Sequence, residues 1–176
     1  KEKKIFKNWK KITFKNVMIL IILASGRGSR LDRLTSNKPK CLVKIKREKT
    51  IINYLEDTFK LFKKIIIVSG YKSKLLEKKF KNNKKIIIVK NKKFKTTNMV
   101  YSLFVPSKYV DNDVVITYSD IIYNKEIIVK LKKMNGLVLP LKSDWLKVWK
   151  LRMSKNQIYK DAENILLNKK YITSIG

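Results

Sequence analysis

The 176-residue sequence contains no histidine and only one cysteine, Cys41. Without histidine, the chain cannot use a Ser-His-Asp or a Cys-His catalytic arrangement. A single cysteine provides neither a disulfide framework nor a cysteine zinc site, so any bound metal is expected to have oxygen ligands. A chemical function of this chain must therefore rest on other polar groups.

Acidic side chains are scarce: the chain has 13 Asp and Glu residues and 43 Lys and Arg residues, which give a formal net charge of +30. The hydrophobic content of 44% argues against a disordered chain. Single lysines and lysine pairs occur along the whole sequence, which is typical of a solvated surface that also attracts polyanions without specificity. Because these cations are dispersed and no RNA- or DNA-binding motif occurs, we expect no specific nucleic-acid partner.

Long apolar runs are also missing. The longest strongly apolar run, residues 17–24, is far shorter than the about 20 residues that a membrane-spanning helix needs, so we predict no membrane span. Residues 1–16 are basic, but the apolar run behind them leads into Gly-Arg-Gly and not into a signal-peptidase site. We interpret 1–16 as a basic N-terminal extension and expect a cytoplasmic location.

Short β-branched runs alternate with amphipathic segments along the rest of the chain. Strands are predicted at 19–23, 65–68, 86–89, 114–117 and 137–139, with another at the C-terminus, and helical stripes at 51–62, 75–80 and 100–104. Continuous apolar strands suit a sheet that is buried on both faces. The alternation predicts an α/β, Rossmann-like layered fold with a mixed, mostly parallel central sheet flanked by helices, and ligands bind such sheets beyond the carboxyl ends of the strands.

The first predicted strand leads into Ser25-Gly26-Arg27-Gly28-Ser29-Arg30, and Lys40 follows directly after Pro39. Glycine permits positive φ and lets backbone N–H groups approach a phosphate closely, while arginine and lysine supply positive charge. The loop is neither a dinucleotide fingerprint, because Leu31 replaces the required small residue, nor a P-loop. It indicates a polyphosphate site if the chain folds back between Arg30 and Lys40; a plain glycine-rich turn is the alternative.

A family resemblance sharpens this interpretation. The string Leu23-Ala24-Ser25-Gly26-Arg27-Gly28-Ser29-Arg30-Leu31, then Leu34-Thr35 and Pro39-Lys40-Cys41-Leu42-Val43, resembles the signature of nucleotidyltransferases that act on sugar phosphates and related compounds. Ser25 stands where the family usually has alanine. Segments 69–72, 97–103, 119–120, 144–153 and 161–163 are similar to the branch of phosphocholine and aminoalkylphosphonate cytidylyltransferases. The resemblance implies a nucleotidyltransferase domain over 17–176 that lacks its C-terminal part, since members usually run several tens of residues further.

The resemblance implies Mg²⁺-dependent nucleotidyl transfer from a nucleoside triphosphate, with CTP expected, to a phosphorylated small molecule such as phosphocholine, with release of pyrophosphate. Arg30 and Lys40 are the expected catalytic cations. The nucleotide-binding residues implied are Leu23, Ala24, Ser25, Gly26, Arg27, Gly28, Thr97, Asn98 and Ser102. Asp120 ends a predicted strand and is the expected magnesium ligand, unless it only caps the next helix. Asp144, Trp145, Asp161 and Glu163 are substrate-site candidates.

Two alternatives stay open. A sugar-1-phosphate nucleotidyltransferase that uses UTP or TTP would carry the same motif. From another class, the chain is compatible with a basic nucleic-acid-binding module or with an inactive fragment that still binds nucleotide. The sequence fixes neither the base, nor the acceptor, nor the oligomeric state.

Overall fold

The computed structural model describes residues 18–151, 153–169 and 171–175. The extension predicted at 1–16 therefore lies outside the described residues. The chain divides into two compact units, Lys1–Asn135 and Gly136–Gly176, which are described separately below. The single nucleotidyltransferase domain expected over 17–176 stays a prediction.

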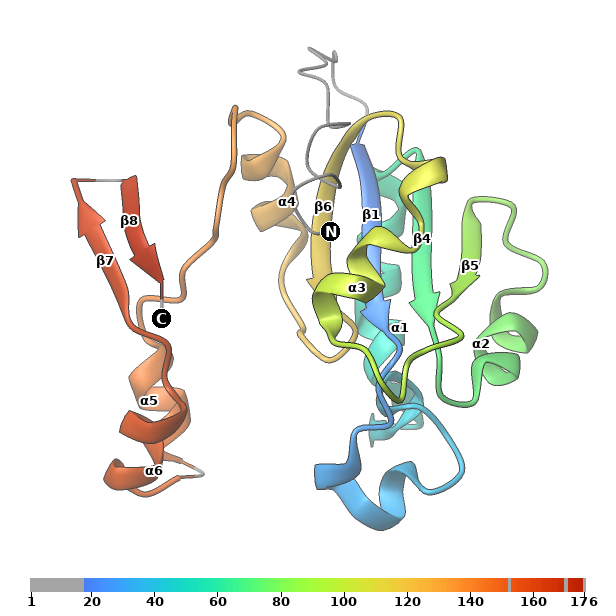
Figure 1. Ribbon diagram of the computed structural model, residues 1–176, viewed down its shortest axis with the longest axis horizontal. Helices are drawn as coiled ribbons and strands as arrows, with labels where there is room; N and C mark the ends of the chain where they lie inside the picture. The colour runs from blue at the N-terminus through green and yellow to red at the C-terminus, as the bar shows by residue number, and fades with distance from the viewer. Residues whose placement is uncertain (1–17, 152, 170, 176) are drawn as a thin grey trace. The chain divides into compact units, whose positions relative to one another are not determined.

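A four-stranded parallel sheet in the order β5-β4-β1-β6 forms the centre of the first unit (Figure 1). Its strands are β1 (Met18–Ala24), β4 (Lys64–Ser69), β5 (Ile86–Lys90) and β6 (Asp113–Tyr118). The register pairs Ala24 with Ser69 and Leu23 with Tyr118, so the carboxyl ends of three strands are level. These findings confirm the predicted α/β layered fold and its four internal strands.

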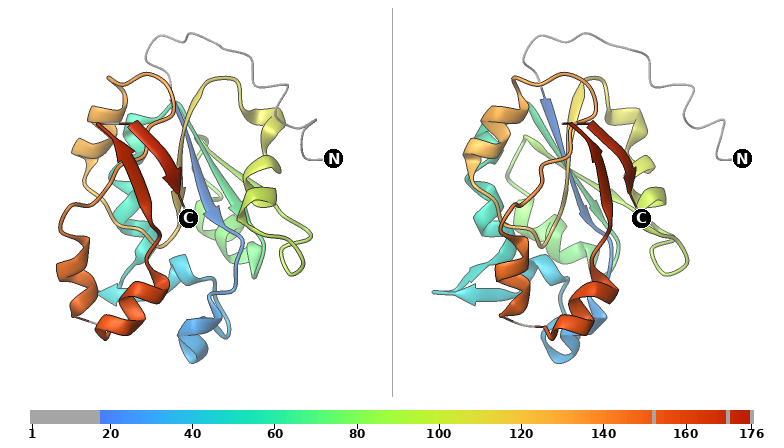
Figure 2. Two further views of the ribbon diagram at one scale, coloured as in Figure 1. Left: turned by 60° about the vertical axis from the view of Figure 1, so that its left-hand side comes forward. Right: turned by 90° about the vertical axis from the view of Figure 1, so that its left-hand side faces the viewer.

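Helices cover both faces of this sheet (Figures 1 and 2). On one face, α1 (Ile51–Glu56), α2 (Ser73–Phe80) and α4 (Lys125–Leu131) contribute Ile52, Leu55, Leu76, Phe80 and Ile128 to a core with Leu20, Ile22, Ile65 and Ile67. On the other face, Leu103 of α3 (Met99–Phe104) packs against Ile19, Ile21, Ile66 and Val68. Burial on both faces explains why β1 and β4 are apolar without alternation.

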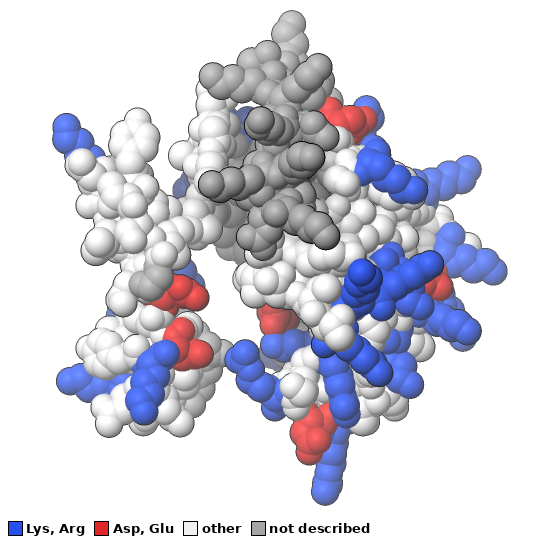
Figure 3. Space-filling model, in the orientation of Figure 1, with Lys and Arg blue, Asp and Glu red and all other residues white. Residues whose placement is uncertain are grey.

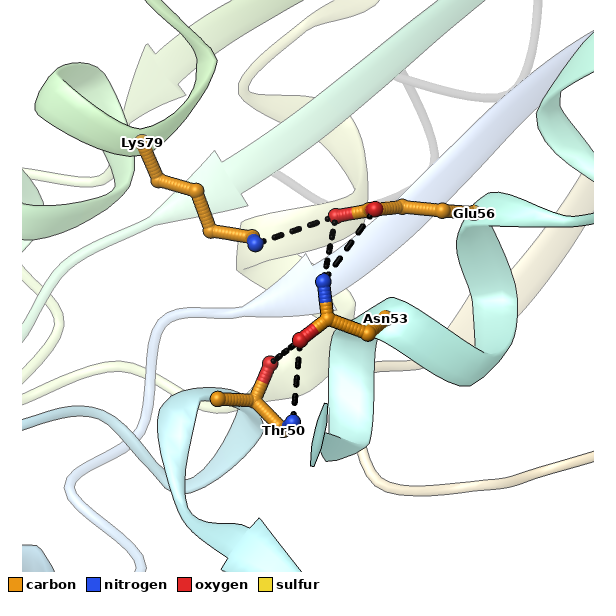
Figure 4. A network of polar contacts seen from close by, with 4 residues as sticks. All are labelled: Thr50, Asn53, Glu56 and Lys79. Atoms are coloured by element: carbon orange, nitrogen blue, oxygen red, sulfur yellow. Dashed lines mark hydrogen bonds and ion pairs between the residues drawn. The ribbon is translucent and has the colours of Figure 1, made fainter. Parts of the chain in front are cut away.

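The predicted helical stripe over 51–62 forms a shorter α1 and a separate 3₁₀ turn at Phe59–Leu61. The break comes at Thr58, whose hydroxyl and backbone N–H both donate to the Leu55 carbonyl, at 2.7 and 2.9 Å, in place of continued helical bonding. A polar network joins α1 to α2 (Figure 4): Asn53 accepts from the Thr50 N–H and donates to Glu56, which pairs with Lys79 at 3.2 Å.

Residues 26–50 and 104–112 add small elements to the first unit. These are 3₁₀ turns at Ser29–Thr35, Lys40–Leu42 and Ser107–Tyr109 and the two-stranded antiparallel pair β2 (Lys44–Lys46) and β3 (Lys49–Thr50). Across the described residues, no helix combines the length and the apolarity that crossing a bilayer requires.

The second unit contains α5 (Trp145–Lys150), α6 (Lys155–Asp161) and an antiparallel hairpin of β7 (Ile165–Asn168) and β8 (Tyr171–Ile175). The hairpin confirms the predicted C-terminal strand. The strand predicted at 137–139 is wrong, because these residues form no strand and Leu137 is fully exposed. Gly136 at φ 82° and Pro140 flank this short run, and three apolar residues between such neighbours do not suffice for strand pairing.

Candidate functional site

Three hydrogen bonds fasten the strand ends together at the carboxyl edge of the sheet. The Ser25 hydroxyl donates to the Val68 carbonyl at 3.1 Å, and the Tyr71 N–H donates to the Ser25 carbonyl at 3.0 Å. On the other side of β1, the Ser119 N–H donates to the Leu23 carbonyl at 3.1 Å. The segments that follow β4, β1 and β6 therefore start from one fixed platform.

The glycine loop after β1 has two glycines in different situations. Gly28 has φ 76°, and a Cβ built on it would lie 3.1 Å from the Lys40 Cβ, whereas a Cβ on Gly26 would meet nothing within 4 Å. The Thr35 hydroxyl donates to the Gly28 carbonyl at 3.0 Å and holds that peptide. Within the described chain, the N–H groups of Gly26, Arg27 and Gly28 donate no hydrogen bond. The loop therefore offers backbone donors of the kind that bind phosphate oxygens.

Lys40 and Asp120, which are 80 positions apart in sequence, form an ion pair beside this loop. The Lys40 Nζ lies 2.5 Å from the Asp120 Oδ2, and the two side chains are 38% and 31% exposed. An ion pair this exposed contributes about 0–1 kcal/mol, so a ligand can replace either partner at little cost. The next helix has Asn124 as its N-cap, which excludes the interpretation of Asp120 as a helix cap.

The arginines of the loop are placed differently. The Arg27 guanidinium lies 5.8 Å from the centroid of the Tyr71 ring, within the range of a cation–π contact. Arg30 lies in the 3₁₀ turn Ser29–Thr35, is exposed, and its side chain makes no hydrogen bond or ion pair to another described residue. The structure thus brings Gly28, Lys40 and Asp120 together, whereas among the described residues no hydrogen bond or ion pair joins the Arg30 side chain to them, and the predicted meeting of Arg30 and Lys40 at one ligand stays a prediction.

Thr97 and Ser102 are tied to a buried residue that the sequence analysis missed. Asn91 is 1% exposed, and its Nδ2 donates to the Thr97 and Ser102 hydroxyls, both at 3.0 Å. Asn98 caps α3 by accepting the Tyr101 N–H at 3.0 Å. These side chains hold the α3 turn in shape, and their nucleotide-binding role stays a prediction. Asn91 directly follows the last residue of β5, a position where a polar residue is a detectable signal in an α/β sheet.

The substrate-site candidates all lie in the second unit. Asp144 pairs with Lys142 at 2.7 Å, and the hydrogen bond from Lys142 lowers the pKa of the Asp144 carboxyl below its ordinary value. Trp145 packs edge-to-face on Trp149, with ring centroids 5.4 Å apart. Asp161 ends α6, and Glu163 is exposed in the segment before β7. Their roles stay predictions.

Asp120 is the one predicted metal ligand, and among the described residues no group of three Asp, Glu, Cys or His could hold a metal ion. Mg²⁺ typically takes one or two carboxylates and completes its shell with waters and substrate phosphates, so a single carboxylate beside a phosphate site fits this ion. Asp111 lies at the opposite edge of the sheet, where it pairs with Lys64 at 3.5 Å, as expected for a residue ahead of its strand.

Basic side chains dominate the face of the first unit in Figure 3, where they gather over the region of α2 and β5 and over the glycine-loop end, with only isolated acidic groups. The summed field of such a surface raises the local concentration of anions. A polyphosphate ligand is therefore attracted to this unit before any specific contact forms.

The chain is similar to several known proteins in sequence and in fold. The CTP:phosphoglutamine cytidylyltransferase of Campylobacter jejuni is 32% identical over 168 residues, which are 90% of this chain and 65% of that protein. The structure of the CTP:phosphocholine cytidylyltransferase from Streptococcus pneumoniae is similar at 31% identity and a TM-score of 0.50, over 59% of this chain and 45% of that one.

The inositol-1-phosphate CTP transferase of T. maritima shares the fold, with a TM-score of 0.70 at 22% identity over 92% of this chain and 64% of that one. The chain thus spans at most 65% of these relatives. The family model described as nucleotidyl transferase matches residues 19–137, which is more than half of the chain. This chain belongs to the nucleotidyl transferase family.

Proposed function

We propose that this chain carries the nucleotide-binding and catalytic part of a Mg²⁺-dependent cytidylyltransferase that transfers CMP from CTP to a phosphorylated small molecule. The observation that carries the proposal is the Lys40–Asp120 pair, which lies beside a glycine loop with unused N–H groups at the carboxyl edge of a parallel sheet. Because the chain spans 65% of its cytidylyltransferase relative, the activity of the whole protein is part of the proposal.

In the reaction, a phosphate oxygen of the acceptor forms a bond to the α-phosphorus of CTP, and the bond from that phosphorus to the β-phosphate oxygen breaks to release pyrophosphate. Two anions must approach each other, so the site has to supply positive charge and alignment, not a covalent group. Lys40 neutralises charge at the α-phosphate or the incoming phosphate. The loop N–H groups bracket the triphosphate, and Arg30, which is exposed beside the loop, is available for the departing pyrophosphate.

Asp120 is the residue that would hold Mg²⁺. The bound ion would neutralise phosphate charge as a Lewis acid. Lys40 donates to one carboxylate oxygen of Asp120, so we expect the ammonium to leave that oxygen when it binds phosphate.

Two features support the choice of base and acceptor. The relatives that share 31–32% identity are both named for CTP, which favours CTP over UTP and TTP. Their named acceptors, phosphoglutamine and phosphocholine, share a terminal phosphate on a small polar body. We therefore place the acceptor in this chemical class.

The test is pyrophosphate release with Mg²⁺, each of CTP, UTP and TTP, and a panel of phosphocholine, phosphoglutamine, aminoethylphosphonate and sugar 1-phosphates. Lys40→Met and Asp120→Asn remove the proposed groups. Lys64→Met and Asp111→Asn are matched controls, because they remove an ion pair at the opposite edge of the same sheet. We expect release with CTP and one acceptor, lost in the first pair of variants and kept in the second.

Other results would favour the alternatives. Turnover only with UTP or TTP and a sugar 1-phosphate would establish the sugar nucleotidyltransferase. Saturable CTP binding without turnover across the panel would indicate an incomplete site. Binding of RNA or DNA with a steep salt dependence and no affinity for CTP would favour the nucleic-acid-binding module.

A further inference from the structure

Tyr71 contacts the glycine loop region at three separate points. Its backbone N–H donates to the Ser25 carbonyl at 3.0 Å, where the loop begins. Its ring lies under the Arg27 guanidinium at 5.8 Å, in the middle of the glycine motif. Its hydroxyl donates to the Ser36 carbonyl, where the following 3₁₀ turn ends. One residue from the segment after β4 thus spans the loop from residue 25 to residue 36.

Gly70 makes this close approach feasible. A Cβ on Gly70 would lie 2.6 Å from both the Ser25 carbonyl oxygen and the Phe94 Cβ, closer than non-bonded atoms approach. The backbone at Gly70 is therefore pressed against the start of the glycine loop, and Tyr71 follows directly from that contact. Tyr71 is therefore placed by the close contact between the end of β4 and the start of the glycine loop.

The loop itself has few other restraints on this side. The Thr35 hydroxyl holds the Gly28 carbonyl from within the loop, whereas Gly26 and Arg27 are exposed and their N–H groups donate no hydrogen bond within the described chain. N–H groups bind a phosphate well only when they are already oriented toward it, because ordering a mobile loop consumes binding energy. Ser25 is held by its own hydroxyl bond to the Val68 carbonyl, so residues 26 and 27 are the part of the loop that depends on a contact from outside it.

We infer that Tyr71 is a positioning residue that holds the glycine loop in the shape in which its N–H groups meet the triphosphate. The inference rests on the proposed function, because it assigns Tyr71 to the loop that would bind the nucleotide. Tyr71 contributes no charge and needs no contact with the reacting atoms. Its loss therefore weakens nucleotide binding and leaves the chemical step largely intact.

The mobility of the loop can be measured by proteolysis, because three of the chain's five arginines lie in this segment: Arg27, Arg30 and Arg33. An arginine-specific protease cuts after each of them, and mass spectrometry resolves the fragments. Arg47, in the β2–β3 turn, is the internal reference in the same digest. Tyr71→Leu removes the ring and hydroxyl contacts, and the conservative Tyr71→Phe removes only the hydroxyl bond to Ser36.

Tyr54→Leu is the matched control, because Tyr54 also lies under a cation, with Lys49 at 5.9 Å, but on α1. Relative to Arg47, we expect Tyr71→Leu to speed cleavage after Arg27 and Arg30 by about tenfold and Tyr71→Phe by about threefold, as the loss of one or two weak contacts implies. CTP affinity, measured by calorimetry, should fall by similar factors. The KM for CTP should rise while kcat changes by less than about twofold.

The outcomes separate the two claims. Circular dichroism shows whether Tyr71→Leu is folded. If the unmodified chain binds CTP and the folded variant has the same cleavage pattern and the same CTP affinity, the inference about Tyr71 is overturned and the proposed function stands. If the unmodified chain binds no CTP, the proposed function fails. Faster cleavage together with a drop in kcat at unchanged KM would also contradict a positioning role.

Discussion

Substituting the two loop glycines separately tests whether this loop is a phosphate site. Gly28→Ala places a methyl group at φ 76°, 3.1 Å from the Lys40 Cβ, whereas Gly26→Ala places it in open space at a φ outside the left-handed region. The two changes add the same atoms two residues apart. They differ only in the backbone conformation at the substituted position and in the atoms that surround the new methyl group.

The two substitutions should change the free energy of unfolding differently, with a loss of stability at Gly28 and none at Gly26. An L-residue in the left-handed region costs about 1–2 kcal/mol, and the tight contact with the Lys40 stem adds to this, so Gly28→Ala should lower the free energy of unfolding by about 1–3 kcal/mol. At Gly26 there is no such strain. The reduced entropy of the unfolded chain should leave Gly26→Ala unchanged or more stable by up to about 1 kcal/mol.

Nucleotide binding should respond in both variants, for different reasons. Gly28→Ala displaces Lys40 from its place beside the loop. Gly26→Ala leaves the fold intact, but its methyl group occupies the open side of the loop, where a phosphate would approach the N–H groups. CTP affinity should fall by about tenfold or more in each, equivalent to about 1.4 kcal/mol.

Urea unfolding followed by circular dichroism, together with calorimetry of CTP binding, measures both quantities in the same protein samples. The decisive result is Gly26→Ala. If this variant is fully stable and binds CTP as tightly as the unmodified chain, the open side of the loop is not where phosphate binds. Equal stability of the two variants would refute the strain argument at Gly28.

Three further predictions concern residues around the site. Gly70→Ala should lower the free energy of unfolding by about 1–3 kcal/mol in urea titrations, because its Cβ would lie 2.6 Å from the Ser25 carbonyl oxygen; full stability would contradict that contact. Asn91→Ala should cost about 1–3 kcal/mol in the same assay, since the buried amide holds Thr97 and Ser102, and an unchanged midpoint would show that these bonds are replaceable. Burial raises the pKa of the Cys41 thiol from 9.0 to about 12. As the pH rises, the thiol therefore loses its proton in the unfolded chain before it does so in the folded chain. Ionisation favours the unfolded chain, and the free energy of unfolding falls as the pH rises from 9 toward 12. Between pH 8 and pH 10 this loss should be about 1 kcal/mol, absent in Cys41→Ala, and equal slopes in the two chains would contradict it.

The sheet was predictable from sequence because its strands are buried on both faces. Runs such as 65–68 lack the alternation of apolar and polar residues that a half-exposed strand shows, and they are too short for a helix. A strand buried on both faces is therefore the structure that fits them. The segment 137–139 has the same residue types, yet a strand also needs a neighbour to pair with, and three residues before a proline do not show whether one exists. The break in the 51–62 stripe depends on the Thr58 hydroxyl, which the apolar pattern does not register.

The site was predictable to a lesser degree. Gly28 and Asp120 could be selected because they follow predicted strands, and Lys40 because it matches the family motif; the fold brings the three together, and their roles stay predictions. The ties that shape the site are contacts between distant segments. The Asn91 amide and the Ser25 hydroxyl bridge to partners 11 and 43 positions away, and a single sequence does not specify such pairs.

Ser25 shows how a small departure from a family pattern can be structural. The family usually has alanine at this position, and the site needs only a small residue there. In this chain the hydroxyl donates to the Val68 carbonyl at 3.1 Å and is 9% exposed, so it links the end of β1 to β4 and leaves the loop N–H groups unaffected. The serine thus adds a neutral hydrogen bond to the platform, which typically contributes about 0.5–1.5 kcal/mol.

The Lys40–Asp120 pair explains how a chain with a net charge of +30 can keep a carboxylate at an anion site. The ammonium neutralises the carboxylate, so neither charge is left uncompensated at the sheet edge. Because both groups are about one-third exposed, the pair contributes at most about 1 kcal/mol and costs little to separate. Under the proposed function, a triphosphate with its divalent cation would offer each group a stronger partner: phosphate for Lys40 and the cation for Asp120. The same two side chains, which stabilise each other only weakly, are therefore available to bind a nucleotide and its cation under the proposed function.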